Sequence, residues 1–142
     1  MPHSLSDRIA IVSSIPLFST LRKKSITHLA RSADEYEYER ETRVVVQGDA
    51  ADACYVITDG SAAVYRNGRK ITDLGPGSVF GELSLLDGGE RTATVVMKTR
   101  GSLLRIHQAA FNELLDSSPT VGRRLLAQLA GRLRAADRTI YG

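Results

Sequence analysis

The feature of this chain that most restricts its fold is a succession of short strand-like runs between residues 33 and 107, several of them closed by a turn signal. The runs are rich in β-branched residues and read TRVVVQGD, ACYVITDG, SAAVYRNGRKITDLGPG, RTATVVMK and SLLRIH. Asn67-Gly68 separates two such runs and is typical of a type I′ β-hairpin. Turns that recur about every 8 to 12 residues favour an antiparallel sandwich or barrel over βαβ units.

Helical patterns flank the strand-like runs on both sides. Ser4 and Asp7 form the S-x-x-D pattern that starts a helix, and a second helix is expected over about residues 22–30. Pro119 suits the first turn of a last helix that runs to about residue 138. The order predicts a single domain over residues 1–142, with a helical lead-in at about 4–32, a β-roll at about 33–107 and C-terminal helices at about 108–138.

Composition sets limits on the class of protein. The chain has 142 residues, 42% of them hydrophobic and 25% charged, which is typical of a globular domain with one core. No apolar run approaches the roughly 20 residues of a membrane span. The N-terminus lacks the features of a secretory signal, and Cys54 is the single cysteine. We therefore expect a cytoplasmic protein without disulfides, in which Cys54 is a small core residue.

The stretch FGELSLLDGGERTATV places Glu82 and Arg91 on either side of a glycine-containing loop. The two side chains either form a salt bridge with each other or hold different parts of one ligand. Gly81 precedes a short helical turn, whose first backbone N–H groups favour an anion. Arg91 suits a phosphate, Thr92 adds a hydroxyl, and Glu82 suits the hydroxyl groups of a sugar. This combination favours a sugar phosphate.

The same stretch closely resembles the phosphate-binding cassette of the cyclic-nucleotide-binding domain family. That family occurs in catabolite-activator-type regulators, cyclic-nucleotide-dependent kinases and cyclic-nucleotide-gated channels. Residues 80–86 and 91–95 fill the family pattern with the usual spacing, and the resemblance covers nearly the whole chain. It implies a mainly β fold with flanking α-helices: an antiparallel eight-stranded β-roll, or jelly roll, with helices at both ends.

The resemblance also implies roles for individual residues. Glu82 would bind the ribose 2′-hydroxyl group. The cyclic phosphate would be bound by Arg91, by Thr92 and by backbone amides of Gly81, Glu82, Leu83 and Ser84. Thr92 occurs in family members that select cyclic GMP and in members that prefer cyclic AMP. Frequency in the family favours cyclic AMP as the ligand, and cyclic GMP stays open.

One arginine of the last helix coincides with an apolar stripe. The stripe consists of Val121, Leu125, Leu129 and Leu133. Arg132 lies in it or along its edge. Its stem either packs along the stripe with the charge in water, or its guanidinium covers a planar ligand. In several channel-type members of the resembled family an arginine at the matching place contacts the base, which implies that Arg132 is a lid.

The sequence contains no recognisable catalytic set. His3, His28 and His107 lack the spacing of metal ligands, so we expect neither a metal site nor a cofactor. The net charge of +3 does not by itself predict nucleic-acid binding. The chain ends shortly after the last helix, so we expect no DNA-binding helix-turn-helix domain. An enzyme is the least favoured class.

We therefore expect a stand-alone receptor domain for a cyclic nucleotide. Ligand binding would reposition the last helix and pass the signal to a partner protein, or to a second copy of the chain through that helix. Two alternatives stay open. The chain is a nucleotide-independent interaction module of the same fold, or it is the regulatory fragment of a larger channel, kinase or transcription factor.

Overall fold

The computed structural model describes residues 3–86 and 88–141, apart from the side chains of residues 132, 133 and 135–141. Two helices come first: α1 (Leu5–Ser14) and α2 (Lys23–Ser32). The strands are β1 (Asp34–Tyr38), β2 (Arg43–Val45), β3 (Ala53–Asp59), β4 (Ala62–Arg66), β5 (Arg69–Leu74), β6 (Val79–Phe80), β7 (Thr94–Met97) and β8 (Gly101–His107). A short helix, α3 (Glu82–Leu86), interrupts them, and α4 (Gln108–Ser117) and α5 (Pro119–Tyr141) follow.

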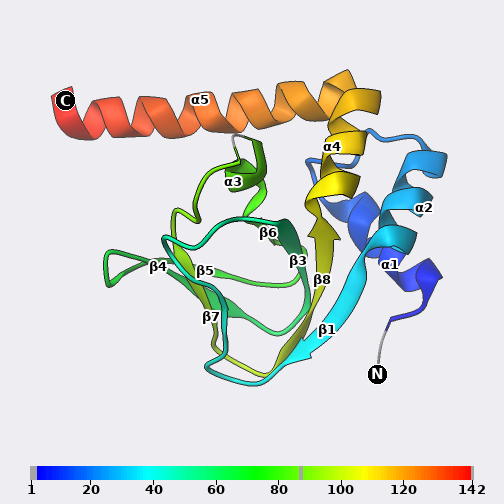
Figure 1. Ribbon diagram of the computed structural model, residues 1–142, viewed down its shortest axis with the longest axis horizontal. Coiled ribbons are helices and arrows are strands. Elements are labelled where there is room, and N and C mark those ends of the chain that lie inside the picture. The colour runs from blue at the N-terminus through cyan, green and yellow to red at the C-terminus, as the bar shows by residue number, and fades with distance from the viewer. Residues whose placement is uncertain (1–2, 87, 142) are drawn as a thin grey trace.

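The strands form two four-stranded antiparallel sheets, in the orders β1-β8-β3-β6 and β2-β7-β4-β5. Figure 1 shows α1, α2 and α4 together at one side of the strands, with α5 running across the top above α3. The mainly β fold with flanking helices, predicted as an eight-stranded β-roll, is confirmed. None of the helices in the described ranges has the length and apolarity that crossing a bilayer requires.

Local signals in the sequence account for several element boundaries. The Ser4 hydroxyl oxygen accepts a hydrogen bond from the Asp7 N–H at 3.1 Å and caps α1. Asn67 and Gly68 both have positive φ values, 53° and 78°, as the type I′ hairpin requires. Pro119 is the first residue of α5, so this expectation from the sequence is also confirmed.

The core has two parts, separated by the sheet that contains β3. Cys54 and Val56 face a cluster formed with the helices, whereas Ala53, Tyr55 and Ile57 face a cluster between the two sheets. Side chains of a strand alternate between its two faces, so β3 is buried on both. Cys54 is fully buried, as predicted.

Candidate functional site

The site is built around the sharp bend at Gly81, between β6 and α3. Gly81 has φ 83°, a conformation that L side chains rarely adopt. A Cβ atom at this position would also collide with Nη1 of Arg91. Glycine is therefore required twice, for the bend itself and for the close approach of the arginine.

Arg91 is buried beside this bend, with 5% of its surface exposed. Its Nη2 donates a hydrogen bond to the Ala53 carbonyl at 2.6 Å, and its Nη1 donates to the Gly81 carbonyl at 3.4 Å. The guanidinium carbon lies 5.8 Å from the ring centroid of Tyr55, and Asp52 Oδ1 is 3.7 Å from Nη2. Carbonyl, aromatic and carboxylate groups thus compensate for the removal of this charge from water.

The backbone of Arg91 is held by the turn that precedes β3. Its N–H donates to the Asp49 carbonyl at 2.7 Å, and its carbonyl accepts from the Gly48 N–H at 2.9 Å. Ala50 and Glu90 form an isolated antiparallel bridge next to these bonds. The loop after α3 is therefore anchored before β7 begins, which fixes where the arginine side chain starts.

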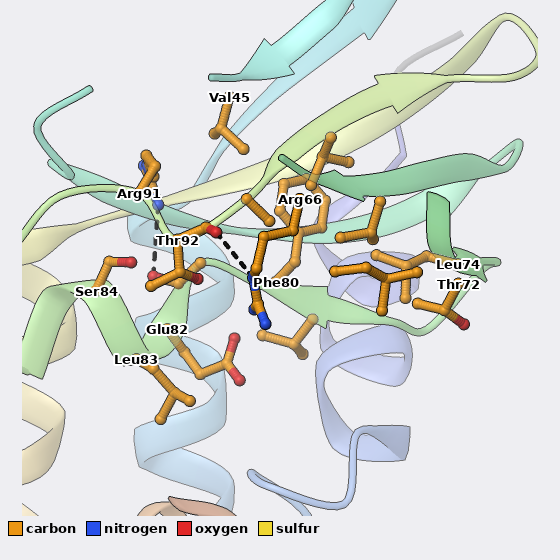
Figure 2. A pocket seen from close by; sticks show the side chains of 16 residues that line it. Val45, Arg66, Thr72, Leu74, Phe80, Glu82, Leu83, Ser84, Arg91 and Thr92 are labelled. Atoms are coloured by element: carbon orange, nitrogen blue, oxygen red, sulfur yellow. Dashed lines mark hydrogen bonds between the residues drawn. The ribbon is translucent and has the colours of Figure 1, made fainter. Parts of the chain in front are cut away.

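Glu82 is the first residue of α3 and is 5% exposed. Figure 2 shows its side chain pointing from the helix into a pocket. The charge of this carboxylate acts on the nearby thiol of Cys54. Burial raises the pKa of that thiol well above its usual range, the negative charge of Glu82 raises it further, and the positive charge of Arg91 lowers it. The charges of Glu82 and Arg91 therefore both act on the same buried thiol, that of Cys54.

The pocket has a volume of about 360 Å³, within the range of small-molecule sites. The predicted ligand-binding residues that line it are Gly81, Glu82, Leu83, Ser84, Arg91 and Thr92. Glu82, Ser84 and Arg91 are buried, whereas Thr92 is exposed at the rim. These residues come together in space, and their individual roles stay predictions.

Arg132 belongs to α5, but its side chain lies outside the described residues. The lid role therefore stays a prediction.

The sequence interpretation missed one side of the pocket. Val64, Ile71 and Leu74 form an apolar wall on the β4–β5 hairpin, and Arg66 lies at its edge. The Nε group of Arg66 donates to the Thr92 carbonyl at 3.1 Å. Side chains alternate along a strand, so residues 64 and 66 lie on the same face of β4. This alternation is the sequence pattern that could have indicated this side of the pocket. The pairing of β4 with β7 decides that this face meets the cassette.

The described residues contain no group of three or more His, Cys, Asp or Glu side chains placed to hold a metal ion. His3 pairs with Glu35 at 2.6 Å, His28 with Glu113 at 3.6 Å and His107 with Asp34 at 2.6 Å. The His28 and His107 pairs are exposed, whereas the Glu35 side chain that His3 contacts is buried, and none of these residues lines the pocket.

Comparison with known proteins identifies relatives of the chain. Residues 35–118 match the model of the family described as cyclic nucleotide-binding domain. The cyclic AMP receptor protein of Thermus thermophilus is 34% identical over 127 residues, which cover 86% of this chain and 59% of that protein. The crystal structure of the catabolite activator protein of the same organism has a TM-score of 0.79 at 34% identity, covering 88% of this chain and 61% of that one.

A kinase regulatory domain is similar as well. The co-crystal structure of the regulatory domain of Toxoplasma gondii PKA with cAMP has a TM-score of 0.73 at 26% identity, covering 77% of this chain and 43% of that one. The present chain thus spans less than two thirds of the length of each of these proteins.

Proposed function

The chain belongs to the cyclic nucleotide-binding domain family, and we propose that it is a receptor for a cyclic nucleotide, with cyclic AMP as the preferred ligand and cyclic GMP as the second candidate. The names of the relatives support cyclic AMP. The observation that carries the proposal is the convergence of buried Glu82 and buried Arg91 on one pocket. We propose a regulatory role without catalysis.

The chemistry of the lining residues suggests how a cyclic nucleotide lies in the pocket. Arg91, Thr92 and the first backbone N–H groups of α3 would take the cyclic phosphate, because a helix start and a guanidinium both favour an anion. Glu82 would accept a hydrogen bond from the ribose 2′-hydroxyl. The apolar wall on the β4–β5 hairpin would receive a face of the base.

The packing of α3 suggests how binding reaches the C-terminal helix. Leu85 of α3 belongs to the buried cluster that also contains Val121 and Leu125 of α5, and Leu83 packs against that cluster. A ligand that shifts α3 would therefore change the surface on which α5 rests. Two positions of α5 would form the two-state element, with Arg132 closing over the base in one of them.

The exposed face of α5 supports a protein partner, or a second copy of the chain, as the next component. Leu126 is 65% exposed and Leu129 is 39% exposed, although both are apolar. Apolar surface of this kind on a regulatory helix is available for docking. Because the relatives are longer than this chain, it also suits the regulatory part of a larger channel, kinase or transcription factor.

One observation favours a second candidate function, an interaction module of the same fold that binds no nucleotide. Both terminal nitrogens of Arg91 already donate to backbone carbonyls, so this arginine also has a structural role. Thermal unfolding with and without each nucleotide separates the candidates. Ligand at about 100 times its dissociation constant adds roughly 2.7 kcal/mol to the free energy of unfolding. No shift with millimolar cyclic AMP or cyclic GMP would favour the interaction module.

A further inference from the structure

A second arginine lines the pocket, and it comes from the β4–β5 hairpin rather than from the cassette. Arg66 is the last residue of β4, directly before the Asn67-Gly68 turn, and it lines the pocket. Figure 2 shows its side chain reaching into the pocket, with the guanidinium beside Thr92. Cations therefore face the same cavity from the hairpin and from the cassette.

The structure holds Arg66 in place through the hairpin and through one end of its guanidinium. Gln47 Nε2 donates to Asn67 Oδ1, and the Asn67 N–H donates to Gln47 Oε1, both at 2.9 Å, so the tip of the hairpin is tied down. The Nε group of Arg66 donates to the Thr92 carbonyl at 3.1 Å. This bond uses one donor and fixes the direction of the other two nitrogens.

The two arginines differ in how far the protein already occupies them. Arg91 donates from both terminal nitrogens to carbonyl groups, and Asp52 lies 3.7 Å away. For Arg66, the Thr92 carbonyl is the one hydrogen-bond acceptor found among the described residues, and no carboxylate there pairs with it. The two terminal nitrogens of Arg66 are therefore available to a ligand. Those of Arg91 already donate to protein carbonyls, so a ligand bound there would share these donors with the protein.

We propose that Arg66 is a second cationic contact for the cyclic phosphate, acting together with Arg91. This inference rests on the proposed function. The guanidinium is anchored on the backbone of Thr92, the residue next to Arg91, so it lies at the phosphate end of the pocket. It is a donor only, and its two terminal nitrogens form a planar fork that matches two phosphate oxygens. The apolar wall of the same hairpin is left for the base.

Arg69 provides a matched control on the same hairpin. It is the cross-strand neighbour of Arg66 and is exposed like Arg66, but it is absent from the lining of the pocket. Arg69→Gln changes the net charge as much as Arg66→Gln does. The difference between the two variants therefore reports contact with the ligand rather than the general field of the domain.

The test is isothermal titration calorimetry of cyclic AMP and cyclic GMP with the unchanged chain, Arg66→Gln, Arg66→Lys and Arg69→Gln. Thermal unfolding without ligand confirms that each variant is folded. We expect Arg66→Gln to weaken the binding of both nucleotides by the same factor, roughly tenfold, because both carry the same phosphate. Arg66→Lys retains the charge but loses the fork, so its affinity is intermediate. Arg69→Gln binds like the unchanged chain.

Three results with the variants would overturn the inference while leaving the proposed function intact. Equal affinities for Arg66→Gln and Arg69→Gln would make Arg66 an ordinary surface residue. A loss confined to one nucleotide would show that Arg66 contacts the base. Tighter binding by Arg66→Gln would show that the arginine blocks the pocket. If the unchanged chain itself bound neither nucleotide, the proposed function would be refuted and this inference with it.

Discussion

The Nη2 group of Arg91 donates a hydrogen bond of 2.6 Å to the carbonyl of Ala53, the first residue of β3. Arg91 lies in the loop before β7, in the opposite sheet from β3. This single bond therefore connects the candidate ligand-binding loop to β3, an inner strand of the other sheet. A residue expected to bind a phosphate also helps to hold the fold together.

Arg91→Ala is expected to abolish the thermal shift produced by either cyclic nucleotide, because the phosphate loses its buried cation. It is also expected to lower the free energy of unfolding by about 1–3 kcal/mol, since buried carbonyls lose their donor. Denaturant unfolding measures the second effect without ligand. Arg91→Lys keeps the charge and serves as the control. Normal binding by Arg91→Ala would show that the phosphate lies elsewhere.

Gly81→Ala is expected to destabilise the fold by about 1–3 kcal/mol and to weaken nucleotide binding. The reasons are the positive φ of 83° and the collision of the new Cβ with Arg91. Gly122→Ala is the control: it lies inside α5, where a Cβ meets no atom within 4 Å, so alanine should stabilise the helix by about 0.5–1 kcal/mol. Equal unfolding midpoints for the two variants would contradict the strain argument.

Glu82→Gln tests the proposed ribose contact when combined with a ligand that lacks the 2′-hydroxyl group. The unchanged chain should bind 2′-deoxy cyclic AMP more weakly than cyclic AMP. The ratio of the affinity for cyclic AMP to the affinity for 2′-deoxy cyclic AMP should be smaller in Glu82→Gln, because a neutral amide is a weaker acceptor than a carboxylate. Calorimetry gives all four affinities. An unchanged ratio would mean that Glu82 does not contact the 2′-hydroxyl.

Arg132→Ala is expected to weaken nucleotide binding without changing the unfolding midpoint of the ligand-free protein, if the arginine closes over the base. Arg134→Ala is the control, because Arg134 is exposed on the same helix. Affinity measurements on both variants decide the matter. Equal affinities would favour the alternative in which the stem of Arg132 packs along the helix.

Cys54 should be unreactive toward thiol reagents in the native protein, because burial raises the pKa of its thiol and excludes the reagent. In the unfolded chain the thiol ionises near its usual pKa of about 8.5. This difference in pKa between the folded and unfolded states makes the free energy of unfolding depend on pH. The contribution of Cys54 is complete below about pH 8.5 and is lost as the pH rises, since only the unfolded state then releases the proton.

Denaturant unfolding between about pH 7 and pH 10 measures this loss. In Cys54→Ala the free energy of unfolding should fall less steeply with pH above about pH 8.5. A native thiol that reacts as fast as the unfolded one would contradict the buried position.

The sequence by itself determined the features that depend on neighbours a few residues away. The hairpin at Asn67-Gly68 follows from backbone conformations that few residues tolerate, and the start of α1 follows from a serine three residues before its partner amide. The cassette residues were recognisable because they lie within one continuous segment. For the same reason their convergence on one site was predictable before their geometry was known.

Only the tertiary structure decided what faces this cassette. The pairing of β4 with β7 brings Arg66 to the Thr92 carbonyl, and the packing of the sheets brings Arg91 to the Ala53 carbonyl. Each contact joins residues more than 20 positions apart, whose approach depends on strand register and on the burial of both core clusters. Register is a property of the assembled sheet, because a shift by one residue turns every side chain to the other face.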